Sequence, residues 1–407
     1  FALQRHSCCV PPAAVPRGPA QNSGRSGSHG GAVNRGIRQQ KLPAAPLNSS
    51  IPISAFTPNT VRGTAGRTLP QLYQEYSRRL FAANAMDFDD LLLKAVEPFK
   101  NDPDVLEMCT EDGELRCIPI SETGRAFFWN QSTFDLAGIA VPDSFDALCQ
   151  AGTVFKEKLG DAYYPLALGW YDRMLFTVYL LQCRYGREWV SGGALQYSES
   201  EIAWALETIE MLEQTHVIPP LKQIAGGGAD SFDKDENWIT GRYGGIYEWD
   251  SSAGKFIDSL ESGQKLTVGT YFSDLGEYHG GFSKIAQGFA ISKHTADPEA
   301  CAELIAFLVS NEEAVRLLGT ERGIPLNHKA YDICGSAGLL GDISAEAYQR
   351  MNDWIGFRID PDFEHASLKG TGGVYEDVFT GLSYGDYSVS QAADRLYAGI
   401  QAALAGE

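Results

Sequence analysis

The sequence lacks several features that would assign it quickly to a class of protein. No apolar run approaches the ~20 residues that a transmembrane helix needs, so no membrane span is predicted. No Cys-x-x-Cys pair occurs among the eight cysteines, which argues against a zinc ribbon or a thioredoxin-like site. The phosphate-binding motif GxxxxGK[ST] and the metalloprotease motif HExxH are also missing. These absences give no support to an enzyme.

Acidic residues are absent from the first 68 positions, although the chain holds 52 of them and a net charge of -19. The remainder is thus a strongly acidic body that repels phosphates, and no nucleic-acid partner is expected for it. Residues 1–67 are rich in Gly, Pro, Ser and Arg and lack hydrophobic periodicity. Such a segment buries too little apolar surface to offset its ordering entropy, so it is predicted to be a disordered, low-complexity region.

The first residues also carry no sign of an export leader. Phe1 is not an initiator Met, no apolar stretch follows the early basic residues, and Cys8 and Cys9 do not lie in a lipobox. No signal peptide or lipid anchor is therefore predicted from the visible sequence. The cysteines are scattered and several have apolar neighbours, as at Cys301, so buried thiols are expected.

Residues 68–107 form a second segment, with apolar residues at helical spacing. The words LYQEYSRRLFAANAMDFDDLLLKAVEPF and NDPDVLE resemble the accessory helical region of UvrD/PcrA-type DNA helicases. No phosphate loop or acidic magnesium-binding box accompanies them, so helicase activity is not implied. A low-complexity start, a helicase-like segment and an unrelated body suggest a chimeric N-terminus.

Residues 108–407 read as one α/β body. Short strands are expected over residues 113–119, 125–129, 266–269 and 288–292. Helices are expected to run from Asp143 toward residue 158, over residues 200–214, and from residue 388 to 404. Asp297 should cap another helix, and the box at residues 310–313 should open a helix that Gly319 ends.

Several short sequence segments of this body, in the same order along the chain, resemble the extracellular solute-binding proteins of carbohydrate ABC transporters. They are DGELRCIPIS (112–121), FWNQSTFDLAGI (128–139), VPDSFDAL (141–148), IYEWDS (246–251), GFAISK (288–293) with PEACAELIAFL (298–308), and GIPLN (323–327). The resemblance implies a type II periplasmic-binding-protein-like fold, with two α/β lobes that close on a sugar about a hinge. Because residues 1–107 match nothing in that family, the first lobe is expected to be incomplete.

The resemblance also implies the partners and the location. A mono- or oligosaccharide is the expected ligand and an ABC transporter permease the expected partner, with the receptor acting as a monomer. The family is extracellular and membrane-associated, often as lipoproteins. No chemistry and no cofactor are implied.

The candidate binding residues lie where strands end, which is where α/β proteins hold ligands. In residues 241–256 an apolar strand stops at a flat aromatic ring flanked by carboxylates, a combination that suits a polyol. Glu248 should point away from Trp249, because strand neighbours alternate faces. The predicted binding residues are Trp249, Asp250, Trp170, Tyr171, Asp172, Arg173, Tyr278 and Asn130.

Structural alternatives stand beside these assignments. Asp172 and Asp250 are both suited to capping helices, and Trp170 to packing in the core. A glycoside hydrolase using Glu248 and Asp250 as paired carboxylates is an alternative function, and a partial helicase-related chain is another.

Overall fold

The strand β3 (Ile118–Asn130) organises the described part of the chain. Along its first half it pairs antiparallel with β8 (Phe282–Phe289), and along its second half with β6 (Gly245–Trp249) and β7 (Leu266–Val268). Two separate strands were expected in this stretch, over residues 113–119 and 125–129. The structure instead has one strand with irregular register beside Pro119, where a missing N–H is tolerated.

The computed structural model describes residues 109–406 apart from 112–113, 227–230 and 342. The low-complexity segment 1–67 and the helicase-like segment 68–107 lie outside the described residues. Two short hairpins and one parallel strand complete the sheets: β1 (Thr110–Glu111) with β2 (Glu114–Leu115), β4 (Val190–Ser191) with β5 (Ala194–Leu195), and β9 (Phe357–Arg358) beside β8.

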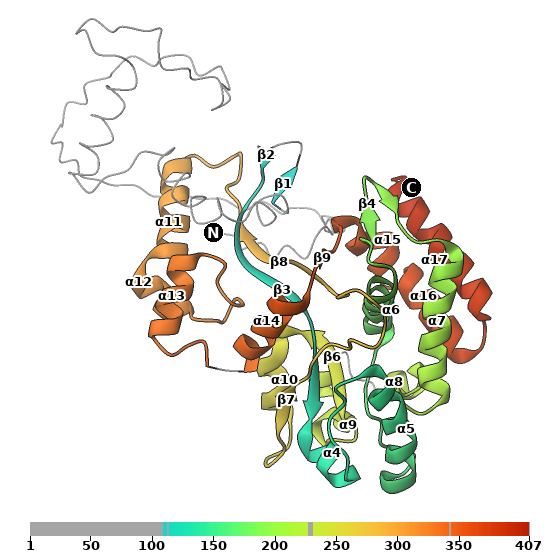
Figure 1. Cartoon of the computed structure of the whole chain (residues 1–407). Helices are drawn as coiled ribbons and strands as arrows, with labels where there is room; N and C mark the ends of the chain where they lie inside the picture. Colours follow the sequence, from blue (N-terminus) through green and yellow to red (C-terminus); the bar gives the residue numbers. More distant parts are fainter. Residues whose placement is uncertain (1–108, 112–113, 227–230, 342, 407) are drawn as a thin grey trace, which may run out of the picture. The chain divides into compact units, whose positions relative to one another are not determined.

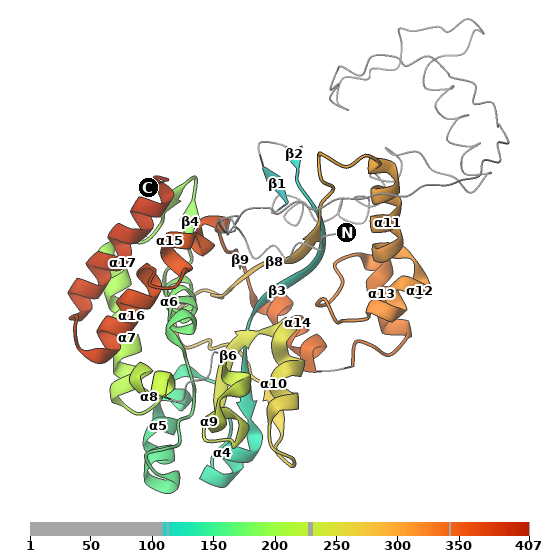
Figure 2. The same ribbon diagram turned by 180° about the vertical axis from the view of Figure 1, so that it is seen from behind.

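Helices lie on both sides of this strand system (Figure 1). In both views α6, α7, α16 and α17 lie together on one side, and α11, α12 and α13 lie on the other (Figure 2). The helix bounds are α4 (Gln131–Ala137), α5 (Phe145–Leu159), α6 (Trp170–Tyr185), α7 (Glu199–Gln214), α8 (Leu221–Gly226), α9 (Glu236–Ile239), α10 (Ala253–Ser259), α11 (Pro298–Ser310), α12 (Glu312–Leu318), α13 (His328–Ser336), α14 (Ile343–Trp354), α15 (Ala366–Lys369), α16 (Val374–Tyr384) and α17 (Val389–Leu404). Short 3-10 turns occupy Phe232–Lys234, Asp250–Ser252 and Pro361–Glu364.

Most of the helix starts expected from the sequence are confirmed. Ser198, Asp297 and Ser388 each accept a backbone N–H at the start of a helix. Two details differ: Ser144 rather than Asp143 caps α5, and Asn311 rather than Ser310 caps α12. Each helix starts one residue later than expected. Several adjacent polar residues can serve as the cap, so the sequence does not show which of them does.

One strand was placed too late along the chain. A strand was expected over residues 288–292, whereas β8 covers Phe282–Phe289 and stops where that expected strand begins. Most of β8 is only half-buried, so its sequence lacks the clean alternation that marks a strand.

The core is unevenly distributed. A large cluster rich in aromatic side chains packs between β3, β6, α6, α7, α16 and α17, with Phe127 near its centre. Against α11 and the first half of β3, the buried apolar cluster formed by the described residues is small and consists of Ile118, Ile305 and Val309. Among the described residues, no helix is both long and apolar enough to cross a membrane.

Candidate functional site

The end of β6 brings an aromatic ring and several charges next to the middle of β3. Trp249 is the last residue of β6 and lies opposite Arg125 in the register with β3. A 3-10 turn begins at Asp250, so the strand does stop where the sequence indicated. Gly245 permits this close approach of β6, because a Cβ there would lie 2.1 Å from the Trp129 ring.

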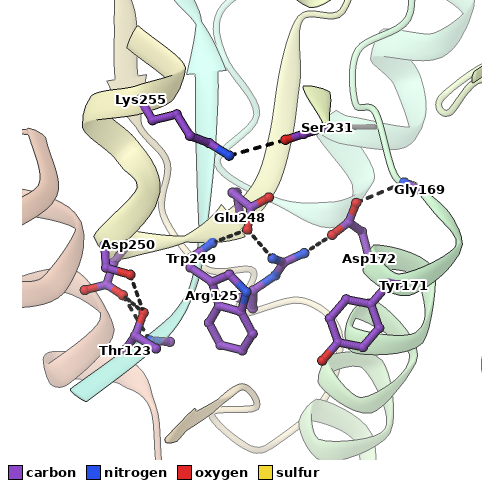
Figure 3. A network of polar contacts seen from close by, with 12 residues as sticks. Thr123, Arg125, Gly169, Tyr171, Asp172, Ser231, Glu248, Trp249, Asp250 and Lys255 are labelled. Atoms are coloured by element: carbon purple, nitrogen blue, oxygen red, sulfur yellow. Dashed lines mark hydrogen bonds and ion pairs between the residues drawn. The ribbon is translucent and has the colours of Figure 1, made fainter. Parts of the chain in front are cut away.

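Arg125 is the charge at the centre of this cluster, and it is fully buried. Its guanidinium donates hydrogen bonds to the carboxylates of Glu248 and Asp172 (Figure 3). Burial acts to lower the pKa of Arg125, but the two carboxylates outweigh it and the pKa is raised. The guanidinium also lies 5.0 Å from the centroid of the Trp249 ring, within cation–π range. This one cation therefore ties β3, β6 and α6 together.

Glu248 departs from the expected alternation of strand side chains. Its carboxylate accepts a hydrogen bond from its neighbour's backbone, the N–H of Trp249, at 2.8 Å, as well as bonding Arg125. The expectation that Glu248 points away is wrong, because the strand ends here and the ladder no longer fixes the side-chain direction. Burial raises the pKa of Glu248, and Arg125 opposes that effect.

Tyr171 and Asp172 come from the first turn of α6. Asp172 accepts the backbone N–H of Gly169 at 3.0 Å, so the carboxylate both caps the helix and pairs with Arg125. Tyr171 donates its hydroxyl to Glu364 at 3.1 Å. Burial raises the pKa of Tyr171 well above its ordinary value, which keeps the hydroxyl protonated and able to donate.

Two lysines share the carboxylate of Glu364 and lie over the two aromatic rings. Lys284 pairs with one carboxylate oxygen, and Lys369 lies 3.0 Å from the other. The ammonium of Lys284 is 4.7 Å from the Trp249 ring centroid, and that of Lys369 is 4.5 Å from the Tyr171 ring centroid. Burial alone would raise the pKa of Glu364, but the two ammonium groups lower it. We refer to Lys284, Glu364 and Lys369 as the lysine–glutamate triad.

The triad forms part of the wall of a cavity of about 620 Å³ between the β3–β8 pair and helices α11–α13. The remaining charged group of the lining is Arg322, and the rest is largely apolar or backbone. Trp249 and Tyr171 are not among the lining residues, but their rings are in contact with the lining lysines Lys284 and Lys369. Among the described lining residues, the charged groups that a ligand meets are therefore three cations and one carboxylate, in a chain whose net charge is -19.

Asp250 adjoins Trp249 in the chain but turns toward β3. Its carboxylate accepts the hydroxyl of Thr123, and the backbone N–H of Gly124 at 3.1 Å. Burial raises the pKa of Asp250 to about 6 despite these hydrogen bonds. Its contacts are those of a group that fastens the turn after β6 onto β3.

The other predicted residues make different contacts. Arg173 is buried, pairs with Glu213 and donates to backbone carbonyls. Asn130 is buried and caps α4. The Trp170 ring packs edge-on against that of Tyr171, while Tyr278 is exposed. The structure thus gathers Trp249, Tyr171 and Asp172 around Arg125, with Trp170 alongside, and leaves the rest outside this network.

Sequence reasoning missed Arg125 and the whole triad. A signal for Arg125 was present, because a lone charge directly before the apolar run AFFW must be paired if it is buried. No comparable signal marked Lys284, Glu364 or Lys369, whose neighbours in the sequence are ordinary loop and strand residues.

The comparison with protein families decides the identity. Residues 73–315 match the family model of the bacterial extracellular solute-binding proteins, which is more than half of the chain. The chain belongs to this family. The matched range begins inside the segment 68–107. No curated protein matches the chain.

Solved structures agree with this assignment. A periplasmic solute-binding protein from Pectobacterium atrosepticum is 29% identical, with a TM-score of 0.72 over 80% of this chain and 82% of that one. A periplasmic oligogalacturonide-binding protein from Yersinia enterocolitica, solved with saturated digalacturonic acid, is 29% identical, with a TM-score of 0.70 over 77% and 80%. A de novo designed cysteine esterase is also 29% identical, with a TM-score of 0.69 over 76% and 77%. The expected type II periplasmic-binding-protein fold is thereby confirmed.

Membership of this extracellular family indicates a periplasmic or extracellular location and a role in binding solutes. The alternative functions are not favoured. A glycoside hydrolase would need carboxylates free to exchange protons with a sugar, whereas Glu248 and Asp250 are held by Arg125 and Thr123.

Proposed function

We propose that this solute-binding protein is the receptor subunit of an ABC importer, and that it binds an oligosaccharide bearing carboxylate groups. The observation that carries the proposal is the lysine–glutamate triad, whose two ammonium groups line the cavity directly above the rings of Trp249 and Tyr171. A uronic acid has the matching chemistry: carboxylates for the lysines and hydroxyls for Glu364.

The charge balance of the cavity supports an acidic ligand. Lys284 and Lys369 share one carboxylate, so each retains donors that can turn to a second anion. Arg322 adds a third cation to the lining. The Yersinia protein, solved in complex with saturated digalacturonic acid, supports the same class of sugar for this chain.

We propose that the aromatic rings of Trp249 and Tyr171 still contact the sugar, as the sequence suggested, but from beneath the lysines Lys284 and Lys369. Lys284 covers the Trp249 ring at 4.7 Å, so a sugar reaches that ring only when the ammonium turns toward the ligand carboxylate. Binding would then exchange a cation–π contact for a charged hydrogen bond and a C–H contact with the ring. Trp249, Tyr171 and Asp172 remain proposed site residues, and Arg125 holds them in place.

The proposed mechanism is closure of two lobes around the sugar, which hides it from water and creates the surface that the permease recognises. The receptor itself catalyses no reaction, acts as a monomer and associates with the membrane. We further propose that residues 108–407 form the binding body and that residues 1–67 and 68–107 are separate segments. The mechanism and the receptor role rest on the family assignment. The segment boundaries rest on the sequence pattern alone, since the family match begins at residue 73.

Thermal unfolding of the full chain with a sugar panel tests the proposal. Digalacturonic acid at ~100 times its dissociation constant should add about 2.7 kcal/mol to stability, whereas a neutral disaccharide at the same concentration should add far less. Since the attraction is between charges, added salt should weaken the acidic ligand's effect. Equal stabilisation by both sugars would overturn the acidic specificity, and stabilisation by neither would overturn the receptor assignment.

Substitution of one triad lysine distinguishes a specific contact with the ligand from a general effect of the protein's net charge on binding. Lys284→Met removes a charged hydrogen bond, worth about 1.5–3 kcal/mol, and should weaken digalacturonic acid binding roughly 10- to 100-fold in calorimetry. Lys265→Met is the matched control, because that lysine is exposed beside β7 and does not line the cavity. Equal losses in the two variants would show that net charge, rather than the triad, attracts the ligand.

A further inference from the structure

Two thiols meet at the base of the first hairpin. Cys109 immediately precedes β1 and Cys117 follows β2, and their Sγ atoms lie 3.1 Å apart. The backbone closes the hairpin at the same point, since the N–H of Arg116 donates to the carbonyl of Cys109 at 2.7 Å. The two sulfur atoms need to approach by only about 1 Å to reach the bond length of ~2.05 Å. We propose that Cys109 and Cys117 form a disulfide that closes this hairpin in the exported protein.

The surroundings of the pair differ from those of the other described cysteines. Cys183 and Cys334 are buried, and no sulfur of another described residue lies within hydrogen-bond distance of either. Cys117 is half-buried, so an oxidant reaches it, whereas its partner Cys109 is only 4% exposed. The pair therefore has one accessible sulfur and one sulfur held against it.

The electrostatics favour Cys117 as the attacking thiol. The hydrogen bond between the two thiols lowers the pKa of Cys117, although burial opposes this, and the same contact together with burial raises the pKa of Cys109. A thiolate is the nucleophile in disulfide exchange. Cys117 is thus the thiol of the pair that loses its proton more readily.

The reaction needs a disulfide as oxidant, such as oxidised glutathione or an exported thiol–disulfide oxidoreductase. The Cys117 thiolate attacks one sulfur of oxidised glutathione, forms a mixed disulfide and releases one glutathione thiolate. Cys109 then loses its proton, attacks the Cys117 sulfur and releases the second glutathione. Two thiols of the protein are oxidised, one glutathione disulfide is reduced, and both protons end on the two glutathione molecules. Extracellular compartments maintain such bonds.

The bond would lie next to the proposed binding cavity without being part of its charged lining. A Cβ placed on Gly288 would lie 2.8 Å from the Cys117 sulfur, so this sulfur packs on the backbone of β8 where β8 lines the cavity. Closing the hairpin would fix the chain that enters β3 at that position. Strands β1 and β2 have two residues each, and so short a hairpin has little stability of its own.

Peptide mapping of the full chain tests the bond directly. The protein is equilibrated in a glutathione buffer poised near −200 mV, as in oxidising compartments, then alkylated under denaturing conditions and digested with trypsin without reductant. Trypsin cuts after Arg116, which separates the peptide 101–116, containing Cys109, from the peptide 117–125, containing Cys117. We expect these two peptides to be recovered linked, with a mass two hydrogens below their sum, and to separate on reduction.

The internal controls come from the same digest. Cys183 and Cys334 should be recovered alkylated, and Cys117→Ser should leave Cys109 alkylated without changing those two. Recovery of peptides 101–116 and 117–125 as separate alkylated species in wild type would overturn the proposal. A link from either of them to the peptide that contains Cys8 and Cys9 would overturn it equally. Neither outcome depends on sugar binding, so the disulfide stands or falls independently of the proposed function.

Discussion

The two halves of β3 run through very different surroundings. Residues 125–130 pair with β6 and β7 and pack into the large aromatic cluster, where Phe127 contacts five other rings besides Trp129. Residues 118–124 pair with β8 and face α11–α13, where two small apolar clusters replace one continuous core. We call the surroundings of residues 125–130 the thick-core region and the surroundings of residues 118–124, with α11–α13, the thin-core region. The strand β3 joins the two.

Exposed apolar side chains are concentrated on the helices of the thin-core region, although Leu136 and Tyr384 are exposed elsewhere. In the thin-core region Leu304, Phe307, Leu317 and Tyr331 are exposed on α11, α12 and α13. The long helices α7 and α17 of the thick-core region have no such side chain. Elements with few buried contacts open at lower free energy than elements of a large core. The cavity therefore adjoins the part of the fold that deforms more readily, and the Arg125 cluster is fixed to the part that does not.

The largest expected effect compares one substitution in the two regions. Ile209 on α7 is fully buried in the large cluster, whereas Ile305 on α11 is 8% exposed in the small one. We expect Ile209→Ala to lower the free energy of unfolding by about 4 kcal/mol and Ile305→Ala by about 2 kcal/mol, because a dense core leaves a cavity that cannot collapse. Urea unfolding of both variants measures the difference. Equal losses would mean that the region around α11 is as tightly packed as the rest.

A smaller effect tests the boundary between the regions, where Asp250 bonds the backbone of Gly124. Burial raises the pKa of Asp250 from 3.8 to about 6, so the folded state holds this proton more tightly than the unfolded state does. The stabilisation is fully present below pH ~4 and is lost as the pH rises through about 6, a change of about 3 kcal/mol. Asp250→Asn removes this dependence and should gain stability relative to wild type between pH 4 and pH 7.

Urea unfolding of wild type and Asp250→Asn at pH 4, 5, 6 and 7 measures that change. Asp258→Asn is the matched control, since Asp258 is an exposed aspartate on the neighbouring helix α10. A difference between wild type and Asp250→Asn that stays constant with pH would contradict the proposed burial of this carboxyl group.

Local features of both regions could be predicted from the sequence, and long-range pairings could not. The helix starting after Asp297 and the stop of β6 at Trp249 depend on residues adjacent in the chain, so their signals are intact in the sequence. The pairing of Arg125 with Glu248 spans 123 positions and that of Lys284 with Glu364 spans 80. No short pattern encodes which charges meet across such distances, so the triad emerged only from the structure.

The alternative roles weighed for Asp172 illustrate the same limit. Its position after Gly169 indicated a helix cap, and its chemistry indicated a ligand contact. The structure gives it the cap and adds an ion pair with Arg125. Sequence reasoning can name the candidate roles of such a residue, but the choice depends on which strand is brought next to it.

The smallest expected effect concerns the outer face of α12. Leu317 is 80% exposed there, and Leu136 is 65% exposed on α4, which lies beside the second half of β3. Leucine and glutamine have similar helix propensities, so Leu317→Gln and Leu136→Gln should each change the free energy of unfolding by no more than about 0.5 kcal/mol in urea. A loss above about 1 kcal/mol for Leu317→Gln alone would mean that other atoms cover this face of α12 in solution. Those covering atoms would then contribute to the stability of the thin-core region. The two regions would differ in which atoms bury their apolar side chains, and not in how stable they are.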